Sequence, residues 1–428
     1  MNQRLAFLLL SALLIVFSAW YFMPVRMGIG GFTDGAVLYK AARISSEAPG
    51  TNYYNLETLA AYPDPDGMVN IFAPYFYPPT ANFLWKILPH DSARAFCFGI
   101  IWTDWLARIV SLIFVCLLSY RLSKNTNPDS ESEINKIYWP VFISPTLFCI
   151  SFFSIPYWLV SEWCQVSGLV ATFIFTAVAA GLLGYKQTGR VLLIFGTMLK
   201  LFPIIFSPLI IKRKFSSWLG FALLAAAIPL LFLLTGVYTY TELLHFLGPK
   251  TLATANATRG LLYSEFNCSL LCDVRLLSVT GTGGKIAGLI YAAVMAGIQG
   301  SFFVLAFVRN RNESSISNLL ILSFASALCM LSFWPLVWLH YYMLAFPFAC
   351  LLISVKQIPA FFRLACAIYV LCFFFKGFYN TDTALIPFTR FGFANDLNLL
   401  VSAAGALALR KQAGLRLSGV YPFISAKL

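Results

Sequence analysis

Apolar runs of about twenty residues recur along the whole chain, and short polar loops separate them. The first run covers residues 5–23, "LAFLLLSALLIVFSAWYFM", and follows a single basic residue, Arg4. A run of this length is typical of a helix that crosses a bilayer, because the hydrocarbon core requires about 20 residues. No small-residue cleavage site follows this run, so we interpret it as a retained span rather than a signal peptide.

The pattern predicts an all-α integral membrane protein, with residues 1–428 as a single polytopic domain. Ten full-length spans are expected near residues 5–23, 97–119, 137–155, 166–184, 217–236, 286–308, 316–333, 341–355, 358–375 and 394–410. Residues 190–214 are basic at both ends and long enough for only one crossing. They are expected to form a broken or re-entrant helix pair that lines a cavity, since irregular backbone at membrane depth needs such surroundings.

Composition supports a membrane protein and orients it. Hydrophobic residues make up 59% of the chain and charged residues only 11%, whereas soluble domains carry roughly 25% charged residues. The short loops rich in Lys and Arg are expected in the cytosol by the positive-inside rule. They account for most of the net charge of +13, which therefore does not indicate nucleic-acid binding.

Two long loops are then expected on the outer face, at residues 24–95 and 238–285. Both are rich in Tyr, Phe, Pro and Asn, and both are too long to be simple connectors. Any catalytic function is therefore expected on the extracytoplasmic side.

Asp34 is the one acid in the glycine-containing stretch "GGFTDGAVLYKAA", residues 31–43, of the first outer loop. Glycine lets the backbone turn sharply or approach a ligand closely. On local sequence alone, Thr33 or Asp34 is an N-cap of the helix that follows. The alternative is that Asp34 carries chemistry, because it is the outer acid that combines glycine neighbours with closeness to a span.

Four other polar residues interrupt apolar sequence. Asp104 and Arg108 are four residues apart, a spacing that predicts an ion pair on one helix face, with a substrate or proton role as the alternative. Lys200 either extends to the cytosolic headgroups or binds an anionic group. His340 lies among interfacial aromatic residues, which form a belt in many membrane proteins.

Metal and disulfide chemistry are not expected. The ten cysteines form no C-x-x-C pair and no metal-like spacing with histidine,. Cys268 and Cys272 lie in the second outer loop, but a separation of four residues fits a disulfide poorly. Asp64 and Asp66 in "YPDPDG" are interpreted as turn residues.

Several short motifs resemble, in order, those of the polyprenol-phosphate-dependent mannosyltransferases of glycosyltransferase family 87. Before the second span these are "FTDGAVLYKAA", "NYYN" and "FYPPTANFLWKILP". After it come "CQVSGLV", "MLKLFPIIFSPLII", "EFNCSL" and "WPLVWLHYYMLAFP". The resemblance implies a GT-C-type bundle of about 10–12 transmembrane helices, with the active site at its extracytoplasmic face.

The resemblance also implies roles for particular residues. Asp34 matches the presumed catalytic aspartate, and it would act as the base that takes the proton of the acceptor hydroxyl. Cations and N–H donors would stabilise the departing phosphate, and His340, Lys200, Arg259 and Arg275 are the candidates. The residues expected to shape the substrate groove are Tyr53, Tyr54, Tyr77, Pro78, Asn82, Gln165, Asn267 and Trp338.

The expected function is transfer of a hexose, mannose by the resemblance, from a polyprenyl-phosphate donor to a lipid or glycan acceptor, with inversion. The protein is expected to act as a monomer in a bacterial inner membrane, without a cofactor or an essential metal. A transporter or flippase of a lipid-linked saccharide is the main alternative, and a non-enzymatic assembly subunit is a third. The sequence leaves the sugar, the acceptor and the linkage open.

Overall fold

The fold is known from a computed structural model of the whole chain. The structure describes residues 33–62, 77–124, 134–154, 165–211, 215–248, 281–312, 315–334, 339–355, 357–373 and 392–412, and a few isolated positions between them. The first apolar run and most of the second long outer loop lie outside these residues, so the predictions made for them remain untested.

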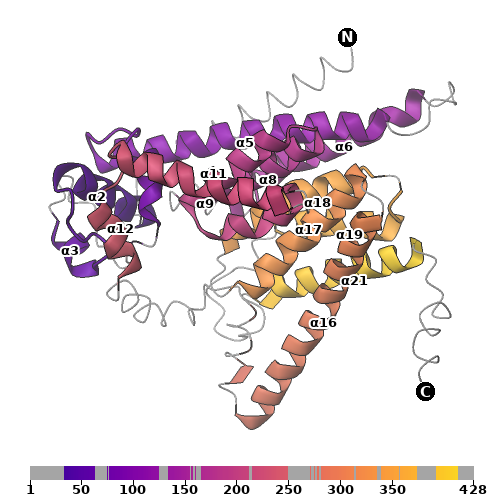
Figure 1. Ribbon diagram of the computed structural model, residues 1–428. Coiled ribbons are helices and arrows are strands. Elements are labelled where there is room, and N and C mark those ends of the chain that lie inside the picture. The colour runs from indigo at the N-terminus through magenta and orange to yellow at the C-terminus, as the bar shows by residue number, and fades with distance from the viewer. Residues whose placement is uncertain are drawn as a thin grey trace.

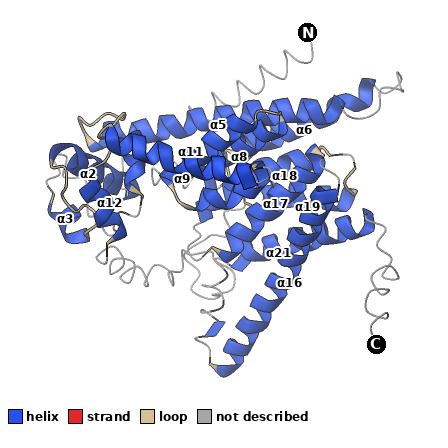
Figure 2. Cartoon of the chain, in the orientation of Figure 1, coloured by secondary structure: helices blue, strands red, loops and turns tan. Residues whose placement is uncertain are grey.

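The described part of the chain is helical and contains no strand (Figure 2). The first group of helices comprises α2 (Thr33–Glu47), α3 (Leu56–Ala61), η1 (Pro79–Ala81), α4 (Asn82–Trp85), α5 (Ala93–Lys124) and α6 (Ile134–Ser151). The second comprises α8 (Ser167–Leu182), α9 (Lys186–Leu199), η3 (Phe202–Phe206), α10 (Ser207–Ile210), α11 (Phe215–Leu234) and α12 (Tyr240–Leu247). The third comprises α16 (Thr282–Asn312), α17 (Ile316–Phe333), η4 (Leu339–Leu344), α18 (Phe346–Ile353), α19 (Ala360–Cys372) and α21 (Gly392–Gln412).

Four of these helices, α5, α11, α16 and α17, are long and apolar enough to cross a membrane. Shorter apolar helices occupy three other predicted spans, at residues 142–151, 167–182 and 360–372. The span expected at 341–355 is not one long helix, because a 3-10 segment, η4, precedes the eight-residue helix α18. Pro347 explains where α18 begins, since proline is accommodated in the first helical turn but lacks an N–H for the helix interior.

Helix α8 lies at the centre of the bundle, where it packs against α5, α9 and η4. Small and apolar residues line most of its length, and twelve of its sixteen residues are buried. The longest helix, α5, runs beside α6 and α8, while α16, α17 and α21 pack together on the other side of the molecule (Figure 1).

Helices α2, α3 and α12 gather at one end of the bundle, beyond the start of α5 (Figure 1, left). Their shared core is aromatic, with Tyr53, Tyr54 and Tyr75 packed ring against ring at centroid distances of 4.7–5.4 Å. A capping box starts α12, because Thr239 and Glu242 exchange side-chain-to-backbone hydrogen bonds,. The first outer loop is thus folded into a small helical layer.

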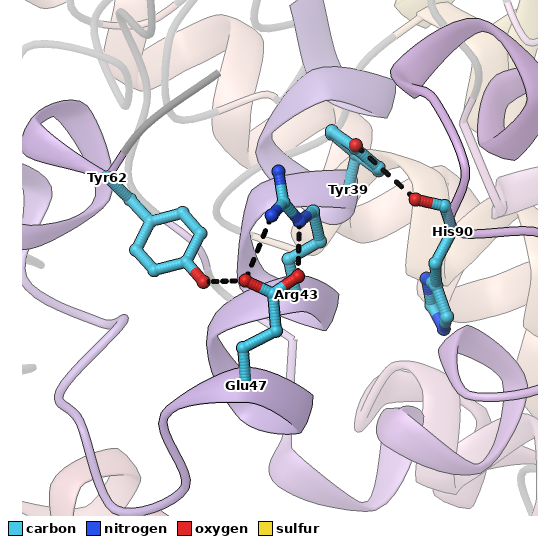
Figure 3. A network of polar contacts seen from close by, with 5 residues as sticks. All are labelled: Tyr39, Arg43, Glu47, Tyr62 and His90. Atoms are coloured by element: carbon cyan, nitrogen blue, oxygen red, sulfur yellow. Dashed lines mark hydrogen bonds and ion pairs between the residues drawn. The ribbon is translucent and has the colours of Figure 1, made fainter. Parts of the chain in front are cut away.

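A network of polar contacts holds α2 within this layer (Figure 3). The Arg43 guanidinium donates to both carboxylate oxygens of Glu47, at 2.6 and 2.9 Å, and the Tyr62 hydroxyl donates to Glu47 as well. The Tyr39 hydroxyl donates to the backbone carbonyl of His90 at 3.5 Å. The ion pair lies within α2 and, being exposed, contributes little stability by itself,. The contacts that position α2 are those of Tyr62 with Glu47 and of Tyr39 with the His90 carbonyl.

The opposite end of the bundle is basic. The last turns of α16 and α21 carry Arg309, Arg311, Arg410 and Lys411, and α9 begins there at Lys186. By the positive-inside rule this end is expected to face the cytosol.

Candidate functional site

Five separate segments bring polar side chains together at the end of the bundle opposite the basic end. The segments are the first turn of α2, the loop before η1, the start of α8, the end of α9 and the 3-10 segment η4. They contribute Asp34, Tyr77, Ser167, Lys200, His340 and Tyr341, which we call the Asp34–Lys200 cluster. These residues are separated by up to 307 positions in the chain, so the cluster depends on the tertiary fold.

Lys200 is the centre of the cluster. Its ammonium group donates to the Ser167 hydroxyl and to the Tyr341 hydroxyl, both at 2.9 Å. It also lies over the Tyr77 and Tyr341 rings, 5.2 and 4.6 Å from their centroids. Such distances allow cation–π attraction, so the two aromatic rings hold the charge in place while the side chain remains half-buried.

The chain direction reverses at Lys200. Helix α9 ends at Leu199, Lys200 is extended with φ −146° and ψ 136°, and η3 and α10 pack back against α9. A Cβ atom on Gly189, near the start of α9, would lie 3.3 Å from Ile210 at the end of α10. Lys200 is therefore at the tip of a helical hairpin whose two ends lie together.

Of the two positions that the sequence left open for Lys200, the structure does not support the one at the headgroups of the basic end. Helix α9 begins with Lys186 at the basic end of the bundle and carries Lys200 away from that end toward Asp34. A helix of fourteen residues is about 21 Å long, which is enough to cross most of a hydrocarbon core.

Asp34 lies half-buried in the first turn of α2, close to Lys200. Burial raises the pKa of the Asp34 carboxyl to about 6, and the nearby charge of Lys200 partly opposes this rise. The helix N-terminus also favours an anion at this position. A carboxyl group with a pKa of about 6 is ionised at neutral pH and retains useful basicity, as a general base requires.

His340 is the fully buried member of the cluster, and its ring lies 4.7 Å from the ring of Tyr341 in an edge-to-face arrangement. Burial lowers the pKa of His340 well below its usual value, and the charge of Lys200 lowers it further. The imidazole is therefore neutral at neutral pH. His340 could therefore donate an N–H hydrogen bond to a phosphate. It would not supply a positive charge, which the sequence alone had left open.

Tyr77 connects the first outer loop to the start of α8. Its hydroxyl donates to the Gln165 side-chain oxygen at 3.2 Å, and its backbone carbonyl accepts from the Tyr54 hydroxyl at 3.1 Å. Thr80 adds a second connection, since its hydroxyl donates to the Met198 carbonyl at 2.8 Å, near the end of α9. Gln165 therefore adjoins the cluster through Tyr77, and the role of both residues in a substrate groove stays a prediction.

Three residues that were expected to shape a substrate groove lie elsewhere. Tyr53, Tyr54 and Asn82 are almost completely buried, and the Asn82 amide donates to the Ser45 and Tyr53 hydroxyls at 2.9 and 3.2 Å. They form the interior of the outer layer, where the Tyr54 hydroxyl holds the Tyr77 backbone in place. Pro78, which is also buried, precedes the 3-10 turn η1.

The remaining candidates cannot be placed. Arg259, Arg275, Asn267 and Trp338 lie outside the described residues, as do Cys268 and Cys272. In the part of the chain that is described, no group of three or more His, Cys, Asp or Glu side chains could hold a metal ion.

Asp104 and Arg108 form the ion pair that their spacing predicted, and both are buried. The Arg108 guanidinium also donates to the Tyr157 carbonyl at 3.1 Å and lies 4.6 Å from the Trp105 ring centroid. The Asp104 carboxylate is pressed against Gly168, where an added Cβ would lie 1.7 Å from Oδ1. The pair therefore adjoins the first turn of α8, next to Ser167, and faces protein instead of an open path.

Sequence reasoning missed Ser167 and Tyr341 as direct partners of Lys200. It also missed a buried polar network in which the Ser332 hydroxyl accepts hydrogen bonds from the Gln299 and Asn398 amides, at 2.8 and 3.0 Å. Asn398 also lies 3.5 Å from the Tyr342 hydroxyl, so the network reaches η4. The one signal in the sequence was the presence of amide side chains inside apolar runs.

No family model matches the chain, so the resemblance drawn from the motifs has no such support, and no curated protein matches either. Among solved structures, the chain is similar to an oligosaccharyltransferase from Archaeoglobus fulgidus in its apo form, with a TM-score of 0.43 and 10% sequence identity. The match covers 93% of this chain and 56% of that one, so this chain spans little more than half the length of that protein.

Proposed function

We propose that this protein is a membrane glycosyltransferase that moves a hexose, with mannose as the first candidate, from a polyprenyl-phosphate donor to a hydroxyl acceptor. The observation that carries the proposal is the Asp34–Lys200 cluster, in which a carboxyl group with a pKa of about 6 lies beside a fixed cation. Transfer from a sugar phosphate requires these two groups, a base for the acceptor and a positive charge for the leaving group.

The chemistry follows from their positions. Asp34 takes the proton of the acceptor hydroxyl as its oxygen attacks the anomeric carbon. The bond between that carbon and the phosphate oxygen breaks, and the phosphate leaves with the electron pair. Lys200 compensates the charge that gathers on the phosphate, aided by hydroxyl groups of Ser167 and Tyr341 that already contact its ammonium group,. Attack from the face opposite the phosphate would invert the anomeric centre.

The location of the cluster supports a lipid-linked donor. The cluster lies at the end of the bundle that the positive-inside rule assigns to the extracytoplasmic side, and Lys200 lies on a hairpin among apolar helices. A donor that diffuses in the bilayer would bring its phosphate to this depth. We propose accordingly that the active site faces outward, and that a bacterial inner membrane is the setting.

One of the features that favoured transport gives it less support in this structure. The Asp104–Arg108 pair, which could have served a transport path, is closed and packed between α5 and α8. We therefore propose enzymatic transfer rather than transport or flipping.

The test is an assay of the purified protein in liposomes with radiolabelled polyprenyl-phosphate mannose and a mixture of lipid and glycan acceptors. We expect label to appear in a new glycosidic product and Asp34→Asn to reduce the rate by about 10²–10⁴-fold, the usual contribution of a general base. Asp91→Asn is the matched control, because Asp91 is an exposed acid of the same loop. Full transfer by Asp34→Asn would remove the base assignment, and movement of intact donor without a product would favour transport.

A further inference from the structure

A second site lies away from the Asp34–Lys200 cluster, in a large groove on the side of the bundle formed by α16 and α17. Its volume is about 1180 Å³, somewhat above the range of about 300–1,000 Å³ that is typical of small-molecule pockets. One wall consists of the ends of α8 and α10 with the start of α9, and the other consists of α16 and α17.

The groove follows the length of α17. Leu319, Leu322 and Ser326 face it from α17, and Gly300, Phe303 and Phe307 face it from α16. Both sets recur at three- and four-residue intervals, so each helix presents one continuous stripe. Helix α17 has 18 residues, or about 27 Å, which is close to the thickness of a hydrocarbon core.

The two ends of the groove differ in chemistry. At the basic end of the bundle, Lys186 and Arg311 line the groove with Asn310 and Ser315, and both cations are exposed. No carboxylate is among the described residues that line the groove. At the other end Trp334 closes the groove, with its ring 6.2 Å from that of Phe202. A row of apolar residues thus leads away from two positive charges that have no carboxylate beside them among the described lining residues.

We propose that this groove binds an anionic diacyl phospholipid of the leaflet at the basic end, with its phosphate between Lys186 and Arg311. Phosphate oxygens accept hydrogen bonds from Lys and Arg side chains, and basic pockets between helices on the cytoplasmic side bind anionic headgroups. The acyl chains lie along the stripes of α16 and α17. A polyprenyl chain held by its phosphate at Lys200 would leave the two cations at this end without an anion, so the phospholipid is the better match.

The experiment is native mass spectrometry of the purified full chain, equilibrated in detergent with phosphatidylglycerol or with phosphatidylcholine of the same acyl chains. We expect phosphatidylglycerol to be retained about 30-fold more strongly, the factor that two cations supply at about 1 kcal/mol each. The double variant Lys186→Gln/Arg311→Gln should lose this preference. Arg121→Gln/Lys411→Gln, which removes two exposed charges at other helix ends of the same side, should keep it.

A second pair of variants tests the groove without changing charge. Gly300 lines the groove and Gly297, one turn earlier on α16, does not. An added Cβ at either position would have open space around it. Gly300→Leu therefore places a side chain in the groove, and Gly297→Leu is its matched control. We expect Gly300→Leu to weaken phosphatidylglycerol retention and Gly297→Leu to leave it unchanged. Equal retention of the two lipids, equal losses in the two charge variants, or unchanged binding in Gly300→Leu would overturn the proposal. Displacement of phosphatidylglycerol by added polyprenyl phosphate would overturn it in favour of the donor lipid.

Discussion

Asp34 links the electrostatics of the cluster to a measurable pH dependence. Burial places the pKa of its carboxyl at about 6, and a general base acts only when it is deprotonated. We therefore expect kcat/KM for transfer to fall as the pH drops through about 6 and to be level above about 7. A profile without this acidic limb, or with the limb near 4, would mean that Asp34 is not the titrating base.

Lys200 should control the position of that limb. Its positive charge lowers the pKa of Asp34, so Lys200→Met should move the acidic limb of the kcat/KM profile to higher pH while reducing the rate. Lys86→Met is the matched control, because Lys86 lies at the same end of the bundle and donates to the Gly236 carbonyl. If Lys200→Met leaves the limb in place, the two groups do not interact as the structure indicates.

At the residue scale the sequence singled out Asp34, Lys200 and His340 as candidates, but it did not predict the contacts of the cluster. The contacts of Lys200 with Ser167 and Tyr341 join residues 33 and 141 positions apart, and no local pattern encodes such pairs. The neutral state of His340 also could not be predicted, because it follows from complete burial beside Lys200. Local spacing did predict the Asp104–Arg108 pair, since one helix contains both residues.

At the element scale, Gly168 sets how closely α8 approaches α5. A Cβ at this position would lie 1.7 Å from Asp104 Oδ1, and the carboxylate is fixed by Arg108, so one of the helices must move. We expect Gly168→Ala to destabilise the protein by about 1–3 kcal/mol, measured by thermal unfolding in detergent.

Gly181→Ala provides the control within the same helix. Its added Cβ would meet no atom closer than Ile210 Cγ2, at 4.0 Å, so the better helix propensity of alanine should leave stability unchanged or slightly raised. Equal effects of Gly168→Ala and Gly181→Ala would show that the contact with Asp104 does not constrain α8.

Hydropathy predicted the existence of most helices, because the length of an apolar run can be read from each segment without knowledge of its tertiary contacts. Each span predicted within the described residues has a helix at its position, with a 3-10 turn and a short helix at 341–355. The sequence left the depth of Lys200 open, because the basic residues at both ends of residues 190–214 indicate where the hairpin begins and not how far its tip reaches. Tyr53 and Tyr54 were expected to shape a substrate groove, but they lie in the interior of the outer layer. The sequence could not distinguish the two positions, because aromatic residues occur both in cores and in binding surfaces.

At the scale of the whole molecule, the proposal requires the Asp34–Lys200 cluster and the basic end to lie on opposite sides of the membrane. Glu57 in α3 and Lys186 in α9 are both exposed and lie at these two ends. In a variant whose natural cysteines are replaced, Glu57→Cys should react with an impermeant maleimide on intact cells, and Lys186→Cys should react only after permeabilisation. The reverse pattern would place the site in the cytosol.

The central claim is that Asp34 and Lys200 act together on one sugar phosphate, and a double-mutant cycle tests it most directly. The measurement is kcat/KM for transfer from polyprenyl-phosphate mannose by the wild type, Asp34→Asn, Lys200→Met and the double variant. Residues that act as a unit lose activity non-additively, so the account predicts a double variant about as slow as the slower single variant. Losses that multiply independently, or a single variant with wild-type activity, would contradict it.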